Sequence, residues 1–127
     1  QAARELAAWL RSRPIAGRTH AVYAALGDKD AQAVVAAFDD VVDDWWLAGT
    51  RDAGARGQSV DALAARLAGS IAGDGRRSPD PVAALDGALR VAEPGDRILV
   101  FGSFHAAEVA LRALQGRGSE AERGEGV

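Results

Sequence analysis

The sequence predicts an α/β domain with a mostly parallel, Rossmann-like sheet that is covered by helices on both faces and lacks its first strand. Segments with helical periodicity alternate with short apolar segments, and the connections between them are short. The apolar segments show little polar alternation, which is typical of strands buried on both faces of a parallel sheet. A helical pattern comes first, whereas a βαβ unit begins with a strand. We therefore expect a further strand upstream of residue 1.

Length and composition are those of one globular domain. The chain has 127 residues, of which 48% are hydrophobic and 26% are charged. Its net charge of −3 argues against a nucleic-acid partner, and no apolar run approaches the roughly 20 residues of a membrane span. The absence of cysteine excludes disulfides and fits a cytoplasmic protein. We expect the domain over residues 1–115 and a disordered tail, rich in Gly, Glu and Arg, over residues 116–127.

The first two expected helices flank a buried strand. Residues 1–12 form one helical pattern, and its apolar face consists of Ala3, Leu6, Trp9 and Leu10. Residues 13–18 include a proline and a glycine and interrupt this helix. Residues 19–26 are rich in β-branched and aromatic side chains, which predicts a strand buried on both faces. The second helix is expected over residues 30–42, with Val34, Val35, Phe38 and Val41 facing inward.

The remaining elements follow the same alternation. Strands are expected over residues 43–48, within 69–75 and over 98–101, and helices over 60–67, 81–92 and 103–114. Trp45 and Trp46 are adjacent in a strand, so they must point to opposite faces, where core packing explains both. Ser59 is a typical N-cap, and Pro81 suits a first helical turn, with Val82, Leu85, Leu89 and Ala92 facing inward after it.

Three of the predicted strands end in residues that can carry chemistry. They lead into Asp28-Lys29-Asp30, into Gly49-Thr50-Arg51 and into Gly102-Ser103. In open parallel sheets, ligands bind beyond the carboxyl ends of the strands. We therefore expect any ligand site at this edge of the sheet.

Gly102 and Ser103 join a buried strand to the start of a helix. The first amides of a helix lack backbone partners and carry partial positive charge. Glycine lets the backbone come close to a ligand, and serine adds a hydroxyl. This junction predicts a site for a carboxylate or a phosphate. The alternative is that Ser103 is an ordinary N-cap and Gly102 an ordinary turn residue.

Lys29 is the only lysine among 15 basic residues. An ammonium is a compact point donor, whereas a guanidinium is a planar fork, so a chain that uses arginine elsewhere has kept different chemistry here. The flanking Asp28 and Asp30 would keep this lysine charged and oriented. The alternative is that Asp30 is only an N-cap and Lys29 a solvated neighbour.

Other polar residues are weaker candidates. Neither His20 nor His105 has a second metal-ligand residue at suitable spacing, so we expect no metal site. His20 is interpreted as structural, whereas His105 follows Ser103 closely and is a candidate anion contact. Arg51 and Arg56 lie on a loop at the same edge and are further candidates for contact with an anion. Four acidic residues are interpreted as a solvated rim, with metal binding as the alternative: Asp39, Asp40, Asp43 and Asp44.

The chain carries no complete catalytic apparatus of its own. It has no glycine-rich phosphate loop, no nucleophile elbow and no ordered Ser/His/Asp set, and no catalytic residue is assigned.

Several of these segments together resemble the C-terminal domain of the folylpolyglutamate synthase/dihydrofolate synthase family, within the Mur ligase superfamily. The resemblance rests on residues 19–26 followed by Asp28-Lys29-Asp30, on Asp44-Trp45-Trp46-Leu47, and on Asp-Arg-Ile-Leu-Val-Phe-Gly-Ser-Phe at residues 96–104. It covers about residues 1–115. Residues 1–6 are similar to the helix that follows the family's Asp-Gly-Ala-His-Asn-Pro motif, which is not in this sequence.

The resemblance implies an ATP-dependent ligase that joins L-glutamate to a folate or pteroate carboxylate through an acyl phosphate. ATP and Mg²⁺ would be bound mainly by the N-terminal and central ATPase domain of the same chain. The present lobe would close over the ATP site, place glutamate, and be inactive alone. A non-catalytic nucleotide-binding or regulatory module of parallel α/β fold is the alternative.

The resemblance also implies roles for single residues. Ser103 would contact glutamate, with Gly102 giving it room, and Asp28, Lys29 and Asp30 would form a motif in the cleft. Arg56 matches the family's frequent Pro-Arg pair in its second residue only, because Ala55 stands before it.

Overall fold

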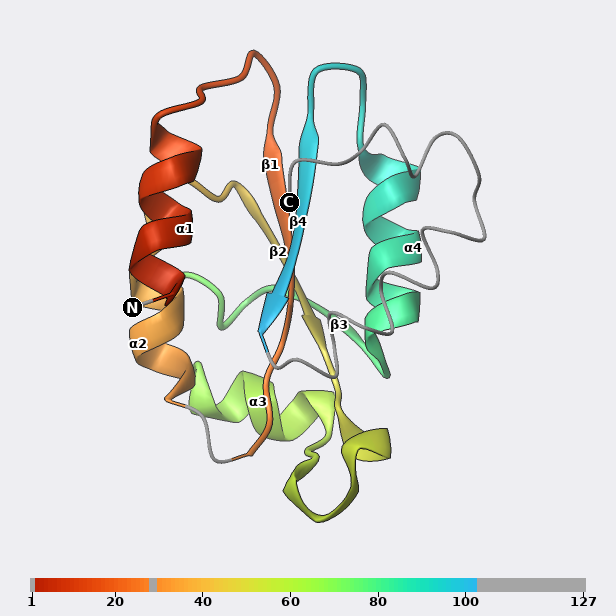
Figure 1. The fold of residues 1–127 in the computed structure, drawn as a ribbon. Coiled ribbons are helices and arrows are strands. Elements are labelled where there is room, and N and C mark those ends of the chain that lie inside the picture. The colour runs from red at the N-terminus through yellow and green to blue at the C-terminus, as the bar shows by residue number, and fades with distance from the viewer. Residues whose placement is uncertain (1, 28–29, 103–127) are drawn as a thin grey trace.

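The computed structural model describes residues 2–27 and 30–102, which form a parallel sheet with helices on both sides (Figure 1). The elements, in chain order, are α1 (Ala2–Arg11), β1 (Thr19–Ala24), α2 (Ala31–Ala36), β2 (Asp44–Ala48), the 3₁₀ segment η1 (Arg51–Arg56), α3 (Val60–Arg66), β3 (Arg76–Ser78), α4 (Pro81–Val91) and β4 (Arg97–Gly102). The expected helix over residues 103–114 and the expected tail lie outside the described residues, and the expected strand upstream lies outside this sequence.

The four strands lie in the order β3-β2-β1-β4, and all neighbouring pairs are parallel. Tyr23 of β1 is in register with Leu47 of β2 on one side and with Phe101 of β4 on the other. The chain thus moves outward from β1 to β3 and then crosses back to place β4 on the other side of β1. The predicted α/β class with a parallel sheet is confirmed.

Alternating side chains of the strands build one core on each face of the sheet. Tyr23 and Trp45 point to the face that is covered by α1, α2 and α3, where Leu10, Phe38 and Leu63 are buried. Val22 and Trp46 point to the opposite face, which α4 covers with Ala84, Leu85 and Ala88. Figure 1 shows α1 and α2 on one side of the sheet and α4 on the other. The prediction that the adjacent tryptophans pack on opposite faces is confirmed.

Three helices differ from the prediction, α2 in its length and α1 and α4 in one side chain each that was expected to face inward. The second helix ends at Ala36 rather than near residue 42, and the next backbone bonds span three residues, as from the Phe38 N–H to the Val35 carbonyl. Two aspartates at 39 and 40 follow directly, and negative charge at a helix C-terminus is unfavourable. Trp9, expected to face inward, is 36% exposed and carries the Arg13 guanidinium over its ring. Val82, also expected inward, is exposed on α4.

The third strand also differs from the prediction, because residues 69–75 form turns and the strand is Arg76–Ser78. Its two arginines are exposed, so it has no apolar signature. Pairing with β2 is what makes it a strand. Within the described residues, no helix has the length and apolar character needed to cross a membrane.

Candidate functional site

The carboxyl ends of β1 and β4 lie side by side and define the candidate site. The crossovers through α2 and α3 lie on one face of the sheet and the crossover through α4 on the other, so the strand order reverses between β1 and β4. Ligands of open α/β sheets bind at such a switch point, outside the carboxyl ends of the strands. β1, which precedes Asp28-Lys29-Asp30, and β4, which precedes Ser103, therefore both end at the position where a ligand is expected.

Gly102 is required by the close approach of β4 to β1. It stands opposite Ala24, the last residue of β1, and a Cβ built on it would lie 1.8 Å from the Ala24 carbonyl oxygen. Its φ of +131° is also a conformation that other residues rarely adopt. Gly102 thus brings the backbone at the end of β4 against the end of β1. Ser103, the next residue, lies outside the described residues.

The chain leaving β1 turns into α2 at Asp30. The Asp30 carboxylate accepts a hydrogen bond of 3.2 Å from the Ala33 amide, so this residue is the N-cap of α2. Asp28 and Lys29 lie outside the described residues, between Gly27 and Asp30. Gly27 and Asp30 thus lie in the connection that follows β1, and Gly102 ends the neighbouring parallel strand β4 at the same edge of the sheet.

A polar network that sequence reasoning missed fixes the end of β1 to the segment after β2. The buried Ala25 carbonyl accepts hydrogen bonds from Thr50 Oγ1 at 3.2 Å and from Gln58 Nε2 at 2.8 Å. Thr50 and Gln58 are bound to each other in turn, since the Thr50 amide donates to the Gln58 carbonyl at 2.7 Å and the Gln58 amide donates to Thr50 Oγ1 at 3.0 Å. These contacts close the loop that contains η1.

Arg66 of α3 adds a cation to this edge. Its Nη1 lies 3.4 Å from the Leu26 carbonyl oxygen and 3.5 Å from Gln58 Oε1. Beneath it, burial raises the pKa of Tyr23 to about 12, which the positive charge of Arg66 only partly offsets. Tyr23 therefore stays a neutral phenol at physiological pH and serves the core.

The other arginines of this edge lie in η1. Arg51 begins the segment and is exposed, and Arg56 ends it. Their loop follows β2, so it lies on the side of β1 away from β4. His105 lies outside the described residues. The role of Arg56 and His105 as anion contacts stays a prediction.

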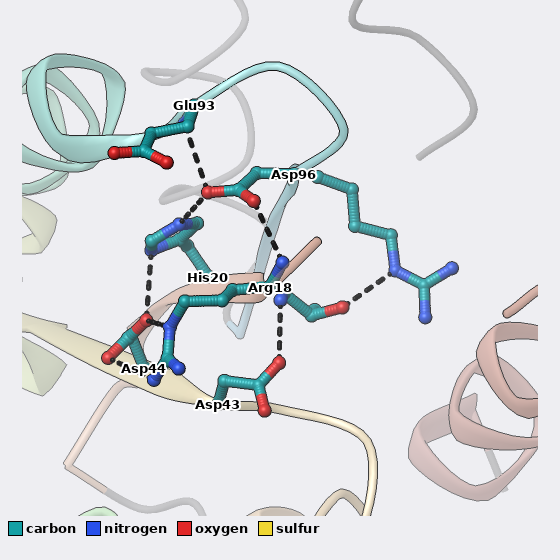
Figure 2. A network of polar contacts seen from close by, with 8 residues as sticks. Arg18, His20, Asp43, Asp44, Glu93 and Asp96 are labelled. Atoms are coloured by element: carbon teal, nitrogen blue, oxygen red, sulfur yellow. Dashed lines mark hydrogen bonds and ion pairs between the residues drawn. The ribbon is translucent and has the colours of Figure 1, made fainter. Parts of the chain in front are cut away.

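The opposite, amino edge of the sheet holds a second polar network (Figure 2). His20 is 1% exposed, and its Nε2 lies 2.9 Å from the Asp96 carboxylate, which accepts its hydrogen bond. Its Nδ1 lies 3.4 Å from the Asp44 carboxylate. Asp96 also accepts hydrogen bonds from the amides of Arg18 at 2.8 Å and Glu93 at 3.0 Å. These two amides and then His20 lower the pKa of Asp96 to about 2.

Arginine side chains complete the amino-edge network. Arg18 binds both carboxylate oxygens of Asp44, at 2.7 and 3.1 Å, and this lowers the pKa of Asp44. The Asp43 carboxylate accepts the Thr19 amide at 2.8 Å, and Arg97 Nε donates to Thr19 Oγ1 at 2.9 Å. Asp43 is exposed and Asp44 partly exposed, as expected for a rim, but both also accept hydrogen bonds, from Thr19 and Arg18, that the sequence did not indicate, because their partners are distant in sequence.

Among the described residues, no group of three or more His, Cys, Asp or Glu side chains is arranged to hold a metal ion. His20 is buried, its Nε2 is hydrogen-bonded to Asp96, and its Nδ1 lies 3.4 Å from Asp44 without a hydrogen bond, which agrees with the interpretation of this residue as structural. Of the two remaining acidic candidates, Asp40 pairs with Arg11 at 2.7 Å and Asp39 is exposed.

Comparison with known proteins shows the family. A model of the family described as "Mur ligase, glutamate ligase domain" matches residues 1–104. The chain belongs to this family. The resemblance drawn from its motifs is confirmed, and we refer to the chain below as the glutamate ligase domain.

The glutamate ligase domain is similar to one part of longer bacterial enzymes. It is 33% identical over 118 residues to the dihydrofolate synthase/folylpolyglutamate synthase of Escherichia coli K12, covering 93% of this chain and 26% of that enzyme. The corresponding enzyme of Haemophilus influenzae is 38% identical over 96 residues, covering 73% of this chain and 21% of that enzyme. The domain thus spans about a quarter of the length of these relatives.

Solved structures agree in fold. The structure of E. coli FolC in complex with DHPP and ADP matches with a TM-score of 0.80 at 32% identity, over 93% of this chain and 27% of that chain. A bifunctional folylpolyglutamate synthase/dihydrofolate synthase with Mn, AMPPNP and L-glutamate bound matches with a TM-score of 0.75 at 31% identity, over 90% of this chain and 26% of that chain.

Proposed function

We propose that the glutamate ligase domain is the C-terminal lobe of an ATP-dependent ligase that joins L-glutamate to a folate or pteroate carboxylate. The observation that carries this proposal is the meeting of the ends of β1 and β4 at the switch point, with Gly102 directly opposite Ala24. Family membership supports it, because the relatives with this domain are dihydrofolate and folylpolyglutamate synthases.

The proposed reaction has two steps. A carboxylate oxygen of the folate or pteroate attacks the γ-phosphorus of ATP, which gives an acyl phosphate and releases ADP. The amine of glutamate, after losing a proton, then attacks the acyl carbon. The C–O bond breaks and phosphate leaves with the electron pair, so the product is an amide. The protein contributes by positioning the amine and neutralising charge.

In this proposal the carboxyl edge places glutamate. Gly102 brings the end of β4 against the end of β1, and Ser103, the next residue, donates a hydrogen bond to the glutamate carboxylate. Asp28, Lys29 and Asp30 line the cleft from the end of β1, and Lys29 supplies positive charge. Arg56 and His105 are further candidate anion contacts.

ATP and Mg²⁺ would be bound mainly by the N-terminal and central domain of the full-length chain. The described residues offer no cluster of metal ligands, and the sequence contains no phosphate loop. The polar groups described at this edge are an amide, a hydroxyl and a guanidinium, with the Asp30 carboxylate turned to its own helix, and such a set fits an anion better than a metal. We therefore assign to this lobe the placement of glutamate and expect it to be inactive alone.

The test uses the full-length enzyme and measures glutamate kinetics. Ser103→Ala and Lys29→Ala are each expected to raise KM for glutamate by roughly 5- to 150-fold, which corresponds to about 1–3 kcal/mol of lost binding. Ser12→Ala is the matched control, because the Ser12 hydroxyl only donates to the Trp9 carbonyl at the end of α1. Unchanged glutamate kinetics in both site variants would refute the assignment. Binding of ATP without any glutamate turnover in the wild type would instead favour a regulatory module.

A further inference from the structure

We propose that Gln58 is a positioning residue for the candidate site. Its side chain holds the chain that leaves β1 in place at the carboxyl edge. This inference rests on the proposed function for its kinetic consequence and on the contacts of Gln58 for its structural part. Neither the sequence motifs nor the family resemblance singled out this residue.

The first step is the position of the carbonyl that Gln58 holds. The pairing of β1 with β2 ends at Tyr23, so the Ala25 carbonyl lies beyond the ladder. Ala25 is completely buried, and a buried carbonyl without a partner is costly. Gln58 Nε2 supplies the shorter of its two side-chain hydrogen bonds, at 2.8 Å, and Thr50 Oγ1 supplies the other at 3.2 Å.

The second step is how Gln58 is itself fixed. Its backbone is bound to Thr50 on both sides, through the amide and the carbonyl. Gly57 allows this closure, because a Cβ there would lie 2.0 Å from the Thr50 carbonyl oxygen. The far end of the Gln58 side chain lies 3.5 Å from Arg66 Nη1. Gln58 is therefore held at its backbone and at its side-chain oxygen while its side-chain nitrogen holds β1.

The third step concerns what lies on either side. Ala24 is in contact with β4 through Gly102, and Ala25 is held from the β2 side by Gln58. Leu26 and Gly27 follow, and then the Asp-Lys-Asp motif begins. Gln58 thus fixes Ala25, the last buried residue before the motif, from the side of β1 that faces away from β4 and Gly102. A change in this contact should loosen the chain leaving β1 at the carboxyl edge, where the proposed function places glutamate.

The kinetic test compares two neighbouring residues in the full-length enzyme. Gln58→Met keeps the side-chain length but removes the amide, and we expect it to raise KM for glutamate about three- to tenfold, the loss of one hydrogen bond, with kcat within about twofold. Ser59→Ala removes the N-cap bond of 3.1 Å to the Ala62 amide and is the structural control. It should lower the thermal midpoint without changing KM. An unchanged KM in Gln58→Met, or an equal rise in both variants, would overturn the proposal.

Two further readouts separate this proposal from the proposed function. In a Lys29→Ala background, Gln58→Met should raise KM much less than in the wild type, because both changes act on the chain that leaves β1. Fully additive effects would contradict the inference. Amide hydrogen exchange over residues 25–31 should be faster in Gln58→Met than in Ser59→Ala, whether or not the enzyme uses glutamate. Equal exchange in Gln58→Met and Ser59→Ala would refute the positioning role of Gln58, even if the enzyme is a ligase. Absence of glutamate turnover in the wild type would refute only the ligase assignment.

Discussion

Replacement of Gly102 by alanine tests whether β4 really approaches β1 as closely as the candidate site requires. Two costs act together. A side chain at φ +131° is strained, which costs about 1–3 kcal/mol. The added Cβ would lie 1.8 Å from the Ala24 carbonyl oxygen and 3.1 Å from the Ala24 nitrogen, so backbone must move, and such overpacking costs about 1–3 kcal/mol more. We expect Gly102→Ala to lower the free energy of unfolding by about 2–6 kcal/mol in total.

Gly69→Ala is the matched control for this change. Gly69 also has a positive φ, of +88°, but no atom lies within 4 Å of a Cβ built on it. It therefore carries the backbone strain without the clash. Alanine also lowers the conformational entropy of the unfolded chain, which favours folding, but this effect is common to both variants and cancels in their difference. The excess loss in Gly102→Ala should thus be about 1–3 kcal/mol.

The assay is urea unfolding of the protein followed by far-ultraviolet circular dichroism. The midpoint should fall further in Gly102→Ala than in Gly69→Ala, with similar m-values, because both unfold the same surface. Equal midpoints would show that nothing crowds the Gly102 position. The close approach of the two strand ends, and with it the geometry of the candidate site, would then be wrong.

Two further predictions concern the amino edge. The pKa of Asp96 falls from 3.8 to about 2 on folding, so this carboxylate stabilises the fold fully above pH 4 and loses that contribution as the pH falls toward 2. The urea midpoint, measured as the pH is lowered, should show this loss, and Asp96→Asn should make the loss smaller. An identical dependence of the midpoint on pH in both proteins would contradict the assignment. His20→Ala should lower the free energy of unfolding by about 2–4 kcal/mol, because it removes a buried hydrogen-bonded ring. In the full-length enzyme, the same change should leave KM for glutamate unchanged. A raised KM would show that the amino and carboxyl edges of the sheet are not independent.

The elements that were predicted correctly are those whose local pattern agrees with their tertiary role. Residues 19–24 are fully buried and mostly apolar, residues 98–101 are all apolar, and α4 has a proline in its first turn and an aspartate N-cap. The strand Arg76–Ser78 could not be predicted from its residues, because three exposed or half-exposed polar side chains carry no strand signal. Only its partner β2 determines it.

The candidate site was predictable to the level of segments and not of contacts. The rule for parallel sheets was enough to place the ends of β1 and β4 at one edge, and Gly102 was singled out in advance. Gln58 was not, because its importance comes from a carbonyl 33 residues away. The partners of Asp43 and Asp44 were missed for the same reason, since Arg18 and Thr19 are brought to them only by the pairing of β1 with β2.

The two edges of the sheet differ in a way that bears on where an anionic ligand can bind. At the amino edge, Asp43, Asp44 and Asp96 lie close together, and their hydrogen bonds use Arg18, His20 and backbone amides. A carboxylate or phosphate arriving there would meet these three carboxylates, which already accept hydrogen bonds from Arg18, His20 and backbone amides. At the carboxyl edge, the described polar contacts around the end of β1 involve a hydroxyl, an amide and a guanidinium, and the nearby carboxylate of Asp30 is turned to its own helix. The charge distribution therefore favours the same edge that the strand order selects, and it does so by an argument that does not depend on the family.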